Sequence, residues 1–284
     1  MEQERSSFTG KIGFVLAAAG SAVGLGNIWR FPYLAAKYGG GIFLLVYLIL
    51  AVTLGFALMA AEISLGRKTK LSAIGAYSAL NKKFAFIGYL GALVPMIILP
   101  YYSVIGGWVT KYLVAFVSGS AAQTTADTYF DAFISSNGEP VVWFLIYLFL
   151  TAAVVFMGVE KGVEKISKVM MPILVVLSIG IAIYSMCLPG AMAGVRYYFM
   201  PDFSKFSVTT VLAAMGQMFY SMSLAMGIMI TYGSYMKKDV SIESSVRQIE
   251  IFDTGIAFLA GLMIVPAVFV FSGGNEAALG KGPG

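Results

Sequence analysis

Seven apolar stretches divide the chain, and each is long enough to cross a lipid bilayer as a helix. A membrane-spanning helix needs about 20 consecutive, mostly apolar residues. The stretches lie at roughly 12–36, 41–65, 84–117, 141–159, 166–188, 207–235 and 248–272. Of the 284 residues, 59% are hydrophobic and only 12% are charged, too little charge for the surface of a water-soluble domain. The sequence therefore predicts an all-α polytopic membrane protein, with residues 1–284 forming a single transmembrane domain in the lipid bilayer.

Composition also excludes several kinds of site. The chain has one cysteine, Cys187, and no histidine. An internal disulfide, a zinc site built from cysteine or histidine, and a histidine-dependent catalytic triad are therefore not possible within it. Arg30 and Pro32 interrupt the first apolar stretch, which is too long for a cleavable signal peptide. We expect no nucleic-acid partner, because so apolar a chain lacks the basic surface that such binding needs.

The basic residues orient the chain in the membrane. If the chain begins in the cytoplasm and alternates sides, most of its 19 Lys and Arg residues fall in cytoplasmic segments. Clusters lie at 67–70, 82–83, 161–168 and 237–247. Cytoplasmic loops of membrane proteins carry such an excess of Lys and Arg. The sequence therefore predicts a cytoplasmic N-terminus.

Two of the stretches have irregular centres. Residues 20–27 of the first contain three glycines and Asn27, and glycines bracket a polar stretch at 216–227 in the sixth. Close packing through small residues would explain the first pattern, and serines that bond to their own helix would explain the second. The alternative is a pair of interrupted helices whose free backbone groups line a polar cavity. Their five-span separation favours an inverted repeat, a first unit of about 11–188 and an incomplete second of about 207–272.

Charged residues inside the spans are the other unusual feature. Arg30 lies deep in the first stretch, Glu62 near the end of the second and Asp253 early in the seventh. Glu62 has the alternative of extending to water at the membrane surface. Asp253 has the alternative of capping a helix as a solvated acid near the cytoplasm. Because intramembrane charges are costly, both acids are also candidates for a functional site.

The residues at 20–33, Gly-Ser-Ala-Val-Gly-Leu-Gly-Asn-Ile-Trp-Arg-Phe-Pro-Tyr, resemble the first-helix signature of the neurotransmitter:sodium symporter family. Further matches lie at 39–47, Glu62 with 66–67, 101–102, 201–203 and 217–235. The bacterial amino-acid branch is the most similar. The resemblance implies a leucine-transporter fold with broken helices one and six. It also implies sodium-coupled symport of an apolar or aromatic amino acid across the bacterial plasma membrane, and no enzymatic activity.

Members of that family have ten to twelve spans, whereas this sequence ends soon after the seventh. We therefore expect further spans or another chain to complete the fold, and we expect the isolated chain not to catalyse coupled transport. An inactive fragment or a membrane interaction subunit is the alternative function. A seven-helix receptor is disfavoured because its N-terminus would lie outside the cell.

The resemblance also implies where ions and substrate bind. It assigns one sodium ion to the Ala22 carbonyl, Asn27, Ser221, Asp253 and the substrate carboxylate, and a second to carbonyls of Gly20 and Val23. Sodium, a hard cation, prefers such oxygen ligands. The substrate site is assigned to Ser21, Ala22, Leu25, Gly26, Ile98, Tyr102, Tyr220, Ser221, Ser223 and Met226. Glycine at Gly24 replaces the acid of the monoamine carriers, which favours an amino-acid substrate.

Gates and supporting residues follow from the same resemblance. Arg30 and Phe31 are assigned to the outer gate, Arg5 and Tyr235 to the inner gate, and Glu62 and Gln217 to supporting roles. Gly162 and Pro172 resemble a motif that lets the fifth helix unwind, although an ordinary helix start with a proline kink explains them equally well.

Chloride dependence is the last expectation. Animal relatives hold chloride beside their first sodium ion, through side chains resembling Tyr47, Gln217 and Ser221. Because Asp253 supplies a negative charge there, we expect one to two sodium ions and no chloride requirement.

Overall fold

The fold is helical throughout the part of the chain that the computed structural model describes, residues 7–126 and 128–273. The first helices are α1 (Lys11–Ala22), α2 (Phe31–Lys37), α3 (Gly41–Leu50), α4 (Phe56–Thr69), α5 (Ala73–Leu80) and α6 (Ala85–Val117). They are followed by α7 (Tyr129–Ile134), α8 (Glu139–Phe156), α9 (Lys165–Met186), α10 (Ala191–Phe199), α11 (Val208–Ser221), α12 (Ile228–Ser234) and α13 (Ile242–Phe271). π-helical turns at Gly26–Arg30, Ala51–Gly55 and Val159–Glu164 lead into α2, α4 and α9. The predicted all-α fold class is confirmed.

The predicted spans correspond to these helices. Among the described residues, five continuous helices are long and apolar enough to cross a membrane, and α1 with Gly26–Lys37 makes a sixth if that bent pair is one span. The remaining predicted stretch, 207–235, consists of α11 and α12 with a non-helical segment between them. Both predicted interruptions are therefore present.

The two interruptions differ in backbone geometry. In the first span, α1 ends at Ala22, Val23 is extended, and the chain bends by 51° before the helix resumes. In the sixth, Ser223 (φ 54°), Ala225 (φ 59°) and Gly227 (φ 69°) take left-handed conformations between α11 and α12. Only glycine adopts such angles easily. Contacts from other helices must therefore hold the segment between α11 and α12 in this conformation.

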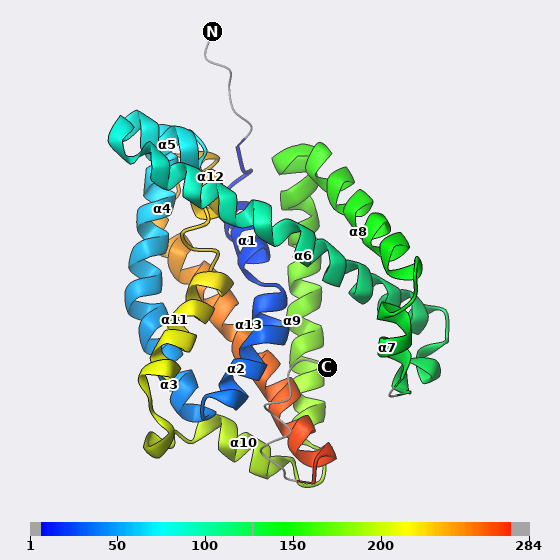
Figure 1. The fold of residues 1–284 in the computed structure, drawn as a ribbon. Coiled ribbons are helices and arrows are strands. Elements are labelled where there is room, and N and C mark those ends of the chain that lie inside the picture. The colour runs from blue at the N-terminus through cyan, green and yellow to red at the C-terminus, as the bar shows by residue number, and fades with distance from the viewer. Residues whose placement is uncertain (1–6, 127, 274–284) are drawn as a thin grey trace.

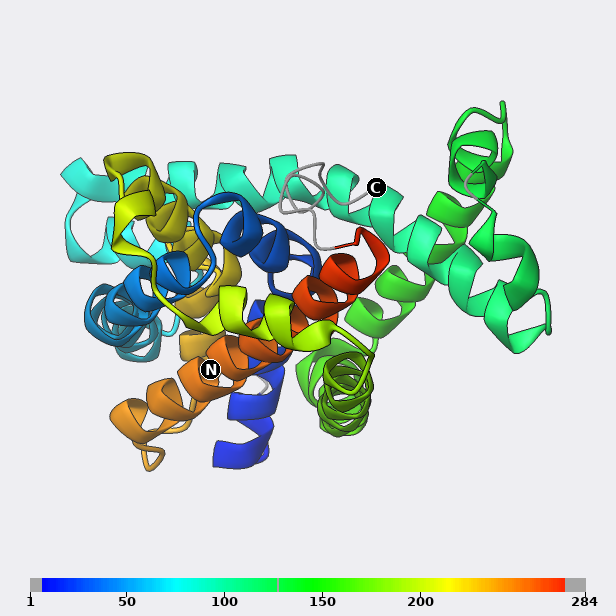
Figure 2. The ribbon, with the colours of Figure 1, turned by 90° about the horizontal axis from the view of Figure 1, so that it is seen from below.

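The broken helices lie inside a bundle. Figure 1 shows α1 and α2 flanked by α11, α13 and α9, while α6 runs obliquely across them and carries α7 and α8 to one side. From below, α10 crosses the lower part of α13, and the α6–α8 arm extends away from the bundle (Figure 2). Gly194 of α10 permits this crossing, because a Cβ there would lie 2.7 Å from Cα of Pro266.

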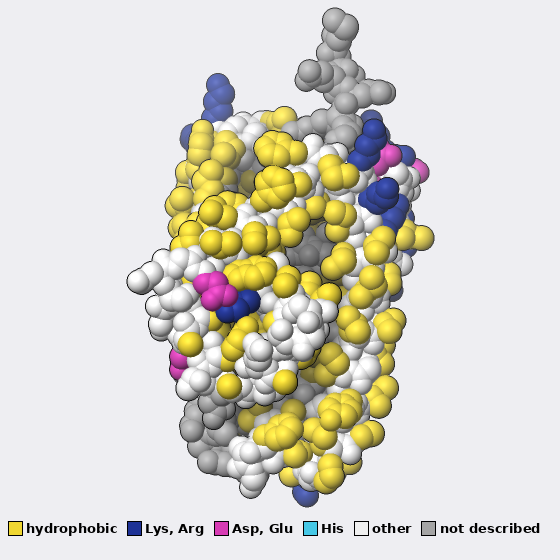
Figure 3. Space-filling view, turned by 90° about the vertical axis from the view of Figure 1, so that its right-hand side faces the viewer, with side chains coloured by type: hydrophobic (Ala, Val, Ile, Leu, Met, Phe, Trp, Pro, Cys, Tyr) yellow, Lys and Arg dark blue, Asp and Glu magenta, His cyan; other side chains and the backbone are white. Residues whose placement is uncertain are grey.

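The outer surface is apolar. On the face that carries α8, hydrophobic side chains dominate, and most of the Lys and Arg side chains in view lie toward the end at which the chain begins (Figure 3). Phe149 and Phe156 of α8 are 72% and 90% exposed. Such a belt suits contact with lipid acyl chains rather than water.

Packing of α4 against α12 depends on glycine and gives a prediction about stability. A Cβ on Gly66 would collide with the backbone carbonyl of Ile230. We expect Gly66→Ala to destabilise the chain by about 2 kcal/mol through overpacking. Gly180→Ala is the matched control, since Gly180 of α9 faces open space, and alanine there should favour the helix. Thermal unfolding in detergent checks this, and an unchanged midpoint for Gly66→Ala would contradict the packing argument.

Candidate functional site

A buried polar cluster joins the first break to α11 and α13. The Asn27 amide donates to Ser221 Oγ (2.9 Å) and to Asp253 Oδ1 (2.7 Å). Ser221 Oγ donates to the same Asp253 oxygen at 2.8 Å, and the Tyr47 hydroxyl donates to Asp253 Oδ2 at 3.2 Å. Asn27 and Asp253 are fully buried and Ser221 is 1% exposed. The alternative of a solvated, helix-capping Asp253 is therefore wrong.

Local structure explains why these residues meet. Asn27 lies in the π-helical turn that follows the first break, where its Oδ1 accepts from the Gly24 backbone N–H at 3.1 Å. Ser221 is the last residue of α11, directly before the second break. Asp253 lies one third of the way along α13. Asn27 at the first break and Ser221 at the second therefore bond to the same Asp253 carboxylate.

The oxygen atoms of this cluster suit a monovalent hard cation as ligands. Ser221 Oγ and Asp253 Oδ1 lie 2.8 Å apart, and the Asn27 amide is directed at both of them. Rotation of that amide by about 180° would exchange its nitrogen for its oxygen and give a third oxygen ligand. The carboxylate would supply the charge that offsets the ion.

A cavity of about 230 Å³ lies beside the two breaks. Its walls include seven of the predicted substrate residues, namely Ser21, Ala22, Ile98, Tyr102, Tyr220, Ser223 and Met226. Ser223 donates to the Ser21 carbonyl at 3.3 Å and so links the breaks across it. Gly26 lies behind the Tyr220 ring, which would be 3.0 Å from a Cβ on Gly26. Leu25, Gly26 and Ser221 are outside the wall of the cavity.

Sequence reasoning missed part of this cavity. Tyr147 and Thr151 of α8 contribute to its wall, together with Pro95, Leu99, Ser103 and Ile228. Tyr147 reaches in because α6 has a glycine opposite it, Gly106, where a Cβ would meet the tyrosine ring. The available signal was the spacing of Tyr147 and Thr151, two polar residues one helical turn apart in an apolar span.

The second predicted sodium position lies at the end of α1. Gly20 faces Ser167 of α9, whose Oγ would be 3.1 Å from a Cβ on Gly20. Val23 packs with Met171 of α9 and Ile256 of α13. The structure thus brings these two predicted residues to the junction of α1 with α9 and α13.

The predicted outer-gate residues point in different directions. The Arg30 guanidinium lies 4.9 Å from the centroid of the Tyr220 ring, a cation–π distance. Phe31 instead points into the core, with its ring centroid 4.9 Å from that of Tyr47 and 5.7 Å from that of Phe43. Phe31 therefore does not line the cavity, because the helical turn after Arg30 directs it inward. Tyr220 occupies the place between Arg30 and the cavity.

The segment before α1 lies at the end of the molecule where Lys and Arg side chains gather, and Phe8 holds it against α12 and Tyr235. The Phe8 backbone N–H donates to the Tyr235 carbonyl at 3.3 Å, and the Phe8 ring stacks on Tyr232 at 5.8 Å between centroids. Arg5, the other predicted inner-gate residue, lies outside the described residues.

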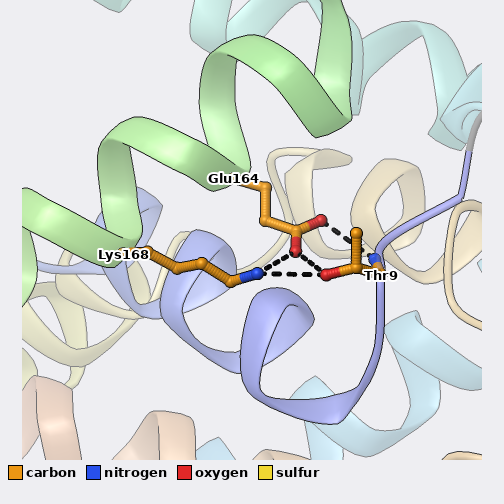
Figure 4. A network of polar contacts seen from close by, with 3 residues as sticks. All are labelled: Thr9, Glu164 and Lys168. Carbon is orange, nitrogen blue, oxygen red and sulfur yellow. Dashed lines mark hydrogen bonds and ion pairs between the residues drawn. The ribbon is translucent and has the colours of Figure 1, made fainter.

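A polar network that the sequence did not reveal lies next to this segment. Glu164 accepts from the Thr9 backbone N–H at 3.0 Å and from the Thr9 hydroxyl, and forms an ion pair with Lys168 at 2.6 Å (Figure 4). Glu164 is 1% exposed, and its carboxylate occupies the space that a side chain at Gly13 would need. The network joins the start of α1 to the π-helical turn before α9.

Two predicted supporting residues hold the breaks. Glu62 Oε1 accepts from the Ala225 backbone N–H at 2.6 Å, at one of the left-handed residues of the second break. Gln217 Nε2 donates to the Gly26 carbonyl at 2.8 Å, in the first break. The alternative in which Glu62 extends to water is wrong, because its other oxygen is buried and has no partner among the described residues.

Comparison with known proteins agrees with this arrangement. The profile described as "Sodium:neurotransmitter symporter family" matches residues 5–131 and 122–276. An uncharacterized sodium-dependent transporter of Bacillus subtilis, YhdH, is 40% identical over 275 residues, which make up 95% of this chain and 61% of that protein. The mouse sodium-dependent neutral amino acid transporter B(0)AT2 is 29% identical over 84% of this chain and 37% of its own length.

A solved structure is also similar. The crystal structure of MhsT in complex with L-phenylalanine superposes with a TM-score of 0.91 at 38% sequence identity, covering 99% of this chain and 64% of that one. The chain thus spans less than two thirds of the length of these relatives. The expected resemblance is confirmed over nearly the whole chain, with the leucine-transporter fold and its broken helices one and six. The chain belongs to the sodium:neurotransmitter symporter family, whose members are multi-pass membrane transporters and not enzymes.

Proposed function

We propose that the protein takes part in sodium-coupled symport of an apolar or aromatic amino acid across the bacterial plasma membrane, with its N-terminus in the cytoplasm. One observation carries the proposal: both helix breaks meet at a cavity that adjoins the buried Asn27–Ser221–Asp253 cluster. A substrate in the cavity and a cation in the cluster would then touch the same two breaks, which is what coupling requires.

The amino-acid backbone would bind at the breaks themselves. The backbone N–H groups of Leu25 and Gly26, at the start of the resumed helix, suit a carboxylate. The Tyr102 hydroxyl, which meets the Gly26 backbone, is also near enough to Gly24 to assist. Carbonyls at the end of α1 and the Ser223 hydroxyl suit the ammonium. Gly24 leaves room for the carboxylate, whereas an acid there would repel it.

The cavity walls favour an apolar or aromatic side chain. Ile98, Met226 and the Tyr220 ring are among its lining residues, and methionine adapts to irregular shapes. The similar MhsT structure holds L-phenylalanine, which supports this substrate class for the present chain.

Sodium would act by drawing the two breaks together. With the substrate carboxylate as an added ligand, the Ala22 carbonyl, Asn27, Ser221 and Asp253 would bind an ion only when substrate is present. A second ion at the carbonyls of Gly20 and Val23 would hold α1 against α9. Release toward the cytoplasm would then require the Thr9–Glu164 contact to open.

The site assignment predicts the effect of two substitutions. We expect Ser221→Ala to weaken sodium-dependent binding of labelled phenylalanine about tenfold, since the cluster loses a ligand and two hydrogen bonds worth roughly 1.5 kcal/mol net. Gly26→Leu should abolish binding, because its side chain would displace Tyr220. Scintillation proximity on the purified full-length protein, in sodium and in potassium, measures both. Undiminished binding in both variants, with Gly180→Ala as control, would refute the site.

Chloride independence is the second prediction. Because the Asp253 carboxylate is held by Asn27, Ser221 and Tyr47, we expect it to replace an anion beside the ion and to exchange a proton after sodium leaves. Wild-type binding should be equal in chloride and gluconate. Asp253→Asn should lose binding in gluconate and regain part of it in chloride. A chloride requirement in the wild type, or normal binding by Asp253→Asn in gluconate, would exclude the built-in anion.

The contact between Glu164 and Thr9, which holds the start of α1 in place, gives a third prediction. Glu164→Ala removes the acceptor for the Thr9 N–H and leaves Lys168 without its ion pair. We expect backbone amides of α1 to exchange with deuterium about tenfold faster, since the start of α1 opens more often. Glu160→Ala is the control, because Glu160 lies on the same turn and is exposed. Equal exchange in both variants would show that Glu164 does not hold this end closed.

A further inference from the structure

A cleft of about 620 Å³ lies on the outer side of the bundle, between α13 and the α3–α4 helix. Val52 and Phe56 form one wall, and Arg247, Glu250, Ile251 and Thr254 form the other. The cleft shares no residue with the substrate cavity or the Asp253 cluster.

Glu250 is the feature that calls for a ligand. Its side chain is buried, with the residue 8% exposed, and its Oε1 has no hydrogen-bond partner among the described residues. Thr254, one turn further along α13, instead directs its hydroxyl toward the buried Tyr47 hydroxyl. A carboxylate in an apolar membrane region is costly unless a cation or hydrogen-bond donors meet it. The Glu250 carboxylate therefore suits a group with several N–H donors and a positive charge.

Arg247 adds a positive charge at the rim of the same cleft, one turn before Glu250. It bonds to Glu243 at 2.9 Å, but both side chains are more than 60% exposed, and such exposed pairs are weak. A guanidinium has five N–H donors, so Arg247 can also hold a phosphate. The rim therefore presents a cationic group beside a deeper anionic one.

The remaining surface of the cleft is apolar and open to the outside. Val52 and Ile251 are each 65% exposed, on a face where neighbouring helices expose hydrophobic side chains to the bilayer. The charged rim lies toward the basic end of the molecule, where headgroups are expected, and the apolar walls extend away from it. This order matches a phospholipid with its headgroup at the rim and an acyl chain along Val52 and Ile251.

We propose that this cleft binds a phospholipid with a primary-amine headgroup, such as phosphatidylethanolamine. The ammonium would donate to the Glu250 carboxylate, and the phosphate would accept from Arg247. A choline headgroup has no N–H to donate, and a glycerol headgroup lacks the positive charge. A free amino acid shares the charges but cannot cover the apolar walls.

The experiment is native mass spectrometry of the purified chain from nanodiscs of phosphatidylglycerol that contain a minor fraction of phosphatidylethanolamine or phosphatidylcholine. We expect the ethanolamine lipid, and not the choline lipid, to be retained. Glu250→Gln should reduce its retention about tenfold, equivalent to about 1.4 kcal/mol, and Arg247→Gln should also reduce it. Glu160→Gln is the matched control, because Glu160 is exposed and lies outside the cleft wall.

A second variant tests the site without changing its charge. Gly255→Leu should fill the cleft, since Gly255 lies in its wall and has open space where a Cβ would be, whereas Gly180→Leu on α9 should not affect retention. Circular dichroism confirms that each variant is folded. Equal retention of both lipids, retention undiminished in Glu250→Gln, or displacement of the lipid by free amino acid would overturn the proposal. So would the absence of retained ethanolamine lipid, which would mean that another group meets Glu250.

Discussion

The rest of the site depends on one requirement, that the backbone and side-chain polar groups at two helix breaks be satisfied inside a membrane. A break frees N–H and C=O groups that hydrocarbon cannot accept. Here Asn27, at the first break, and Ser221, at the second, bond to the same Asp253 carboxylate. Gln217 and Glu62 meet further backbone groups of the two breaks. A change in one break therefore alters the other, which is the physical basis for the proposed coupling of an ion to a substrate.

Close backbone approach makes this arrangement possible. Gly66 and Gly233 let α4 and α12 touch almost backbone to backbone, so that the half-helix after the second break has a firm support. The carboxylate of Glu164 likewise uses the space left by Gly13. The same small residues that bring elements together also limit which side chains the chain tolerates there, because a methyl group would have to occupy space already filled.

Side chains on the outer surface and in the interior differ in polarity and in hydrogen bonding. Apolar side chains on α8 are exposed on the outer surface, whereas the buried side chains of Asn27, Ser221 and Asp253 bond to one another in the interior. Glu250 is the exception on the outer side, and its unpartnered oxygen led to the proposed lipid site. In a membrane protein, a buried acid without a partner is thus as informative as a cluster with one.

The sequence alone determined the seven apolar stretches and the two interruptions, because length and apolar composition are local properties. Its resemblance to a family made Asn27, Ser221 and Asp253 candidates for one site. It did not determine that Phe31 points into the core, that Tyr147 reaches the cavity from α8, or that Glu164 meets Thr9 across 155 residues. These contacts depend on how tilted helices cross and on where glycines let them approach. Helix direction and separation are set by packing over the whole bundle, so only the tertiary structure decided them.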